Sequence, residues 1–88
     1  MDRFEAMSIL IATVEAGSFS AASRKLSVPL PTVSRKLAAL EEHLGVRLLI
    51  RSTRSLTLTD AGLTDLESCN QILDQVSEAE RSASGEYS

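Results

Sequence analysis

The chain has few of the residues on which catalysis, metal binding and disulfide bonding depend. Its 88 residues include one cysteine, one histidine, two prolines, four glycines and no tryptophan, and aromatic residues make up 3%. A lone cysteine, Cys69, excludes an internal disulfide, and with His43 it supplies too few ligands for a zinc site. No glycine-rich phosphate loop and no pair of nucleophile and base can be assembled. We therefore expect neither an enzyme nor a cofactor.

Long apolar runs are also missing. No stretch of about 18 apolar residues is present, and the start, MDRFEAM, lacks the basic region of a signal peptide. We therefore expect no membrane contact and a cytoplasmic location. The shortage of aromatic residues indicates a core of Leu, Ile, Val and Ala, which favours helices. A chain of this length forms one small domain, near the size at which a second copy often adds stability.

Charge is distributed unevenly along the chain. The formal net charge is −3, yet residues 24–54 contain seven Lys or Arg against two acids, Glu41 and Glu42. Residues 60–88 contain only Arg81 against seven acids. The basic middle of the chain is typical of a nucleic-acid-binding segment.

Two short helical patterns meet at a tight break within residues 18–45. After Pro31, which suits the first position of a helix, the apolar side chains fall on one helical face: Val33, Leu37, Leu40 and Leu44. Gly45 suits the left-handed position after the helix. A preceding helix runs to about Leu26, with Ser20 as its predicted cap. Two short helices joined by a sharp turn predict a helix-turn-helix.

The flanking segments predict a scaffold helix and a wing. Residues 2–16 form a helix whose expected inward stripe is Phe4, Met7, Leu10, Ile11 and Val14. Residues 46–50 and 56–59 are β-prone and predict a small hairpin over residues 46–59, with Arg51 and Arg54 at its tip. The alternative for this segment is a solvated basic loop. The predicted fold is thus mostly α, a winged helix-turn-helix over residues 1–59.

A long amphipathic pattern follows over residues 60–84, capped by Thr59. Its narrow apolar seam, in a 3–4 rhythm, consists of Leu66, Cys69, Leu73, Val76 and Ala83, with Leu63 and Ile72 beside it. Because the other positions are polar, this helix is expected to pair with a second copy. The alternative is a helix that folds back on its own domain. Residues 85–88 have linker composition.

Several ordered motifs resemble those of one bacterial family. They are MDRF at residues 1–4, EAGSFSAA at 15–22, VSR at 33–35, LEEHLGVRLL at 40–49 and LTDAG at 58–62. Together they make residues 1 to about 85 similar to the amino-terminal DNA-binding domain of LysR-type transcriptional regulators. The resemblance implies a homodimer, joined through antiparallel linker helices, on a roughly palindromic operator in double-stranded DNA. It also implies a carboxy-terminal domain for a small-molecule inducer, which this sequence lacks, and a hinge that starts at residues 85–88.

The resemblance further implies where the chain meets DNA. It places major-groove contacts at Leu30, Pro31, Thr32, Ser34 and Arg35 and a minor-groove contact at Arg54. Arg35 is the strongest candidate for a bidentate contact to guanine, and Leu30, where the family often has Gln or Ser, could meet a thymine methyl. We expect phosphate contacts from Ser20, Arg24, Lys36, Arg51, Ser52 and Thr53. The main alternative function is a protein-interaction module acting through Leu66, Leu73 and Val76, which salt-dependent binding to DNA would exclude.

Overall fold

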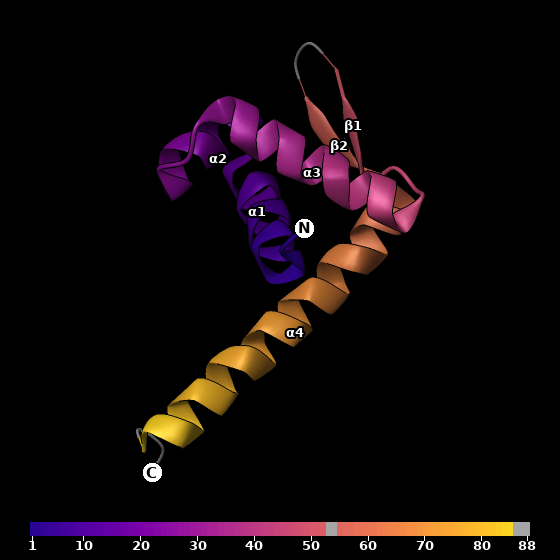
Figure 1. Cartoon of the computed structure of the whole chain (residues 1–88). Helices are drawn as coiled ribbons and strands as arrows, with labels where there is room; N and C mark the ends of the chain where they lie inside the picture. The colour runs from indigo at the N-terminus through magenta and orange to yellow at the C-terminus, as the bar shows by residue number, and fades with distance from the viewer. Residues whose placement is uncertain (53–54, 86–88) are drawn as a thin grey trace.

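The computed structural model describes residues 1–52 and 55–85. The elements follow in the order α1 (Arg3–Ala16), α2 (Phe19–Leu26), α3 (Leu30–Leu44), β1 (Leu49–Arg51), β2 (Leu56–Leu58) and α4 (Asp60–Ser84). Figure 1 shows α1, α2, α3 and the hairpin gathered into a body from which α4 extends, with its far end well away from the body. The predicted fold class, a winged helix-turn-helix followed by a long helix, is confirmed.

Helices α2 and α3 each begin slightly earlier than predicted. Ser18, and not Ser20, caps α2, because its hydroxyl oxygen accepts a hydrogen bond from the backbone N–H three residues on (3.0 Å). Ser20 therefore lies within the helix and is exposed. Helix α3 begins at Leu30, which places Pro31 at its second position, where the missing N–H is still harmless.

The turn between α2 and α3 is closed by hydrogen bonds from one side chain and from the backbone. Ser27 adopts the left-handed conformation with φ 56°, and the Ser23 hydroxyl donates to the Val28 carbonyl oxygen. The Val28 N–H donates in return to the Ser23 carbonyl oxygen (3.1 Å). This turn sets α3 across α1 and α2 and leaves one long side of α3 open to solvent.

The core lies where α1 is surrounded by the other helices. The predicted inward stripe of α1 is partly wrong: Phe4 is 56% exposed, whereas Ile9, Leu10 and Thr13 are buried. Because α1 packs against α2, α3 and α4, small residues such as Ala6 also face inward. Thr13 is tolerated in the core because its hydroxyl donates to the Ile9 carbonyl oxygen (2.7 Å).

The inward face of α3 is mostly as predicted. Val33, Leu37 and Leu40 are buried, but Leu44 is 45% exposed. Leu44 is the last residue of the helix and lines a shallow concavity next to the start of α4. Gly45 follows with φ +72°, in the left-handed conformation that the sequence predicted for the helix end.

The hairpin is a short antiparallel pair that is anchored at its base. Leu49 pairs with Leu58 and Arg51 with Leu56, so the prediction of a hairpin over this segment is confirmed. Leu48 and Leu49 are buried and tie the base of the hairpin to the core.

Glu41 of α3 holds the base of the hairpin. One carboxylate oxygen, Oε2, accepts from the backbone N–H groups of Leu48 (2.7 Å) and Leu49 (3.2 Å). Since both leucines are buried, no solvent could replace this acceptor without opening the fold. Glu41 is therefore one of the side chains that set the orientation of the hairpin relative to α3.

We predict that Glu41→Ala lowers the free energy of unfolding by about 1–3 kcal/mol, because it leaves buried N–H donors unpaired. Glu41→Gln is the matched control, since an amide oxygen can accept from the same two donors, and it should lose less than half as much. Urea unfolding followed by circular dichroism measures both. Equal losses for the two variants would contradict this role.

The amino-terminal half of α4 belongs to the core of its own chain. Cys69 is 2% exposed and Leu66 packs against the same cluster, as α4 crosses α1. The prediction that Cys69 pairs two chains is therefore wrong, since its side chain is already covered. Residues 74–85, in contrast, are all exposed.

Burial raises the pKa of the Cys69 thiol to about 11, and Asp65 adds to the shift through its charge and by accepting a hydrogen bond from Sγ (3.6 Å). The ordinary value is 9.0. Above that pH the unfolded chain releases a proton that the folded chain retains. Stability is therefore complete below pH 9 and falls as the pH rises towards 11, by up to about 3 kcal/mol.

We expect this fall in urea unfolding measured at about pH 8 and about pH 11. Cys69→Ala is the control: it costs stability at both values but should remove the part of the pH dependence that belongs to the thiol. An identical pH dependence in the variant would show that other groups cause it.

Within residues 1–52 and 55–85, no single helix is long and apolar enough to cross a membrane. Helices α1 and α2 together reach the required length and composition, but a bend of 118° separates them and their apolar residues contribute to the core.

Candidate nucleic-acid interface

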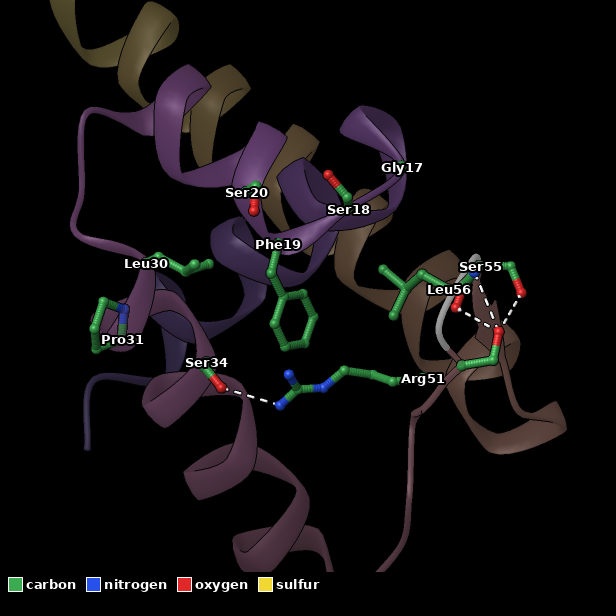
Figure 2. A pocket seen from close by; sticks show the side chains of 11 residues that line it. Gly17, Ser18, Phe19, Ser20, Leu30, Pro31, Ser34, Arg51, Ser55 and Leu56 are labelled. Carbon is green, nitrogen blue, oxygen red and sulfur yellow. Dashed lines mark hydrogen bonds between the residues drawn. The ribbon is translucent and has the colours of Figure 1, made fainter.

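A groove opens between the start of α2, the start of α3 and the hairpin. Figure 2 shows side chains from all three elements turned towards one another across it. Its lining residues are Gly17, Ser18, Phe19, Ser20, Leu30, Pro31, Ser34, Arg51, Ser52, Ser55 and Leu56. Six of the residues predicted to meet DNA are therefore brought together here: Ser20, Leu30, Pro31, Ser34, Arg51 and Ser52.

The outer face of α3 follows directly from its helical phase. Because Val33 and Leu37 point into the core, Pro31 and Arg35 must point outward, and both are exposed. Thr32 and Ser34 lie half-buried on the flanks, and Leu30 is 42% exposed at the start of the helix. All the predicted base-reading residues of α3 thus lie in its first two turns, on or beside the surface.

The basic side chains divide into those with an acidic partner and those without one. Lys25 Nζ lies 3.0 Å from Glu15 Oε1, and Lys36 forms an ion pair with Glu5. Among residues 1–52 and 55–85, Arg24 and Arg35 have no acidic group within the 4.0 Å of an ion pair. Their charge is therefore uncompensated by a neighbour, whereas that of Lys36 is partly used to join α3 to α1.

Arg51 is engaged within the protein itself. It is the last residue of β1, and not at the tip of the hairpin as predicted. Its Nη2 donates to Ser34 Oγ (3.0 Å), and its guanidinium carbon lies 4.2 Å from the centroid of the Phe19 ring. One side chain therefore connects the hairpin to both α2 and α3.

Ser52 forms hydrogen bonds within the turn of the hairpin. Its hydroxyl oxygen accepts from the Ser55 N–H (3.1 Å) and lies 2.9 Å from Ser55 Oγ. Ser52 is nevertheless exposed, so it remains a candidate phosphate contact. Thr53 and Arg54 lie outside the described residues.

Phe19 and Glu41 were not among the predicted site residues. The contact of Phe19 with Arg51 joins positions 32 apart in the sequence, for which no local pattern exists. For Glu41 the sequence offered one indication of a structural role. It is an acidic residue within a basic segment, and it follows the apolar Leu40.

Comparison with known proteins places the fold and this surface in one family. Residues 4–63 match the bacterial regulatory helix-turn-helix proteins of the lysR family. The chain belongs to that family. Its lysR-family relatives include an HTH-type transcriptional repressor of Pseudomonas aeruginosa (strain UCBPP-PA14), 42% identical over 97% of this chain and 27% of its own. The HTH-type transcriptional activator AaeR of Escherichia coli (strain K12) is 42% identical over 86% of this chain and 25% of its own.

Solved structures of the lysR family agree with the fold described above. The complex of the CbnR DNA-binding domain with DNA matches with a TM-score of 0.88 and 39% identity, over 99% of this chain and all of that one. The complex of the BenM DNA-binding domain with catB site 1 DNA matches with a TM-score of 0.90 and 30% identity, over 96% and 92% of the two chains. The chain spans about a quarter of the length of the curated relatives named above.

The predicted dimer residues are divided between two sides of α4. Leu66 and Cys69 face the core, as described above, and Leu73 is half-buried. Leu63 is 50% and Val76 36% exposed. The body therefore covers Leu66 and Cys69, whereas Leu63 before them and Val76 after them are exposed.

Proposed function

We propose that this chain binds double-stranded DNA in a sequence-specific manner, as a dimer on a roughly palindromic operator, and so regulates transcription. The first turns of α3 enter the major groove and the hairpin lies at the minor groove. The observation that carries the proposal is the placement of the outward face of α3 and the hairpin on either side of one groove. The close match to a DNA-binding domain solved on DNA supports it.

The proposed DNA contacts are of two kinds: contacts to phosphates, which position the protein, and contacts to bases, which read the sequence. Ser20 and Arg24 lie one helical turn apart on α2, both exposed, where they can meet successive phosphates and hold the body in register. Arg35 is the reader, because its planar group can pair with two acceptors of one guanine in the major groove. Thr32 and Ser34 flank it with hydroxyl groups, and Leu30 offers an apolar surface.

The dimer is supported by the exposed apolar residues of α4. In this helix of 25 residues, the stretch from residue 74 to its end is exposed, so that stretch gains little from packing on its own chain. Ile72 and Val76 lie one turn apart and are exposed, and Phe4 and Met7 of α1 form a shallow concavity together with Ile72. A second copy of the helix would cover this surface and place two recognition helices on one duplex.

The test is a selection from a randomised duplex pool, followed by fluorescence-anisotropy titration of the selected sequence at two salt concentrations. We expect an inverted repeat, and an affinity that falls by ~10³-fold or more between about 50 mM and about 200 mM salt if the dimer contacts six or more phosphates. Sedimentation equilibrium on the free chain measures the dimer independently.

The other outcomes separate the alternatives. Salt-sensitive binding without a selected motif would leave a non-specific DNA-binding domain. Selection of a single half-site would support sequence-specific binding to DNA but contradict binding as a dimer. Failure to bind DNA even at low salt would favour the protein-interaction module.

A further inference from the structure

We propose that Arg51 acts on DNA recognition through Ser34: it holds the Ser34 hydroxyl so that its hydrogen faces the DNA, and Ser34 then reads a hydrogen-bond acceptor on one base. This inference rests on the proposed DNA-binding function and deepens it. It replaces the sequence-based expectation that Arg51 contacts phosphate. Arg51 is thus a positioning residue, and Ser34 the residue that meets the base.

The first step concerns the direction of the hydrogen bond between the two side chains. A guanidinium group has only donors, so in the contact between Arg51 Nη2 and Ser34 Oγ (3.0 Å) the hydroxyl oxygen must accept. The single hydrogen of Ser34 therefore points away from Arg51. Within residues 1–52 and 55–85, Ser34 Oγ has no second hydrogen-bond partner. This hydrogen remains available to a ligand in the groove.

The second step concerns what holds Arg51 in place. Its guanidinium carbon lies 4.2 Å from the centre of the Phe19 ring, a distance at which a cation is attracted to the face of an aromatic ring. Figure 2 shows the ring and the guanidinium group next to each other, with the dashed bond running on to Ser34. The backbone of Arg51 is fixed as well, because it pairs with Leu56 across the hairpin. Arg51 is therefore restrained at both ends.

The third step concerns what a donating hydroxyl selects. In the major groove, guanine offers N7 and O6, adenine N7 and thymine O4 as acceptors, whereas cytosine offers only an amino donor. A Ser34 hydroxyl that donates therefore favours the first three edges over cytosine at one position of the half-site. Arg51 occupies one of the two lone pairs of the hydroxyl and turns its hydrogen away from itself. Without Arg51 the hydroxyl can rotate freely and accept through either lone pair, so this preference is weakened.

The experiment compares base preference, and not affinity alone, in four proteins: wild type, Ser34→Ala, Arg51→Lys and the double variant. Lysine retains the positive charge and serves well at a phosphate, but it lacks the planar group that stacks on Phe19 and reaches Ser34. We expect Ser34→Ala and Arg51→Lys to reduce the preference at the same base position, by about 2-fold to about 12-fold. The double variant should lose no more than Ser34→Ala alone. The salt dependence should be that of the wild type.

Arg81→Lys is the matched control. It makes the same chemical change on the exposed end of α4, away from the groove, and it should leave every base preference unchanged. Thermal unfolding by circular dichroism verifies that all variants are folded.

Two results would overturn the inference while the proposed function stands. One is an Arg51→Lys variant with the base preference of the wild type, as expected of a phosphate contact. The other is a loss of preference at a different position from that affected by Ser34→Ala. A wild-type chain that selects no motif would instead overturn the proposed function, and this inference with it.

Discussion

Gly62→Ala is expected to lower the free energy of unfolding by about 3 kcal/mol or more and the melting temperature by about 12 °C or more. Gly62 lies in the first turn of α4, packed on the backbone at the base of the hairpin. A Cβ atom there would lie 2.1 Å from the Leu48 carbonyl oxygen and 3.0 Å from Leu58 Cδ2. In an open helix the same change would stabilise by up to about 1 kcal/mol. The steric term is larger, so we expect the opposite sign.

The clash is costly because the Leu48 peptide cannot move aside. Its carbonyl oxygen accepts from the Thr59 N–H (2.9 Å), and its N–H donates to Glu41 (2.7 Å). Moving Leu48 would break both bonds and shift the hairpin relative to α3. Gly62→Ala should therefore also weaken DNA binding, even where the variant is kept folded at low temperature.

Gly85→Ala provides the matched control for this prediction. Gly85 ends α4 with φ +79°, and a Cβ atom there would have nothing within 4 Å. Its cost is confined to backbone strain of about 1 kcal/mol, which fraying of the last turn can relieve. Thermal and urea unfolding of the two variants, compared with wild type, test the argument. Equal stabilities for Gly62→Ala and Gly85→Ala would show that Leu48 yields more easily than its hydrogen bonds indicate.

The parts of the fold that local chemistry determines could be predicted from the sequence. Thr59 caps α4, its side chain accepting from the Gly62 N–H (2.9 Å), and Gly45 ends α3, both as predicted. These features depend on residues within four positions of one another. Ser18 and Ser20 illustrate the limit of such signals, because both are good caps and only the path of the chain decides between them.

Features that depend on tertiary contacts could not be predicted in this way. The period of α1 identified a helix, but three neighbouring helices decide which residues are covered, and they leave Phe4 exposed. The sequence of α4 indicated an apolar stripe, but it did not indicate whether the same chain or a second copy covers that stripe. Cys69 proved to face its own body, whereas Val76 remains exposed.

The candidate site shows the same division. The outward position of Arg35 followed from helical phase alone, since Val33 and Leu37 had to face inward. The role expected for Arg51 followed only from its charge, and charge does not distinguish a side chain that meets DNA from one that binds a neighbouring hydroxyl. Its contacts with Phe19 and Ser34 join three elements distant in sequence.

Arg35→Ala is expected to have the largest effect on DNA binding, a loss of about 1–3 kcal/mol with relaxed preference at one base position. Arg35 is exposed at the centre of the outer face of α3, and no acidic group among the described residues lies within 4.0 Å to share its charge. Removing it should cost little stability, because the side chain is exposed and is not part of the core cluster. Anisotropy titrations against the selected operator and its single-base variants measure the loss.

Variants of two further arginines distinguish contacts to bases from contacts to phosphates in that experiment. Arg24→Ala should weaken binding to all sequences alike and reduce the salt slope by about 1.8, as expected when each subunit of the dimer loses one phosphate contact. Arg81→Ala, on the exposed end of the acidic α4, should change neither quantity. Arg35→Ala must differ from both by changing the order of preferred bases. If it weakened all sequences equally, as Arg24→Ala does, then α3 would lie against the backbone of the duplex and another element would read its sequence.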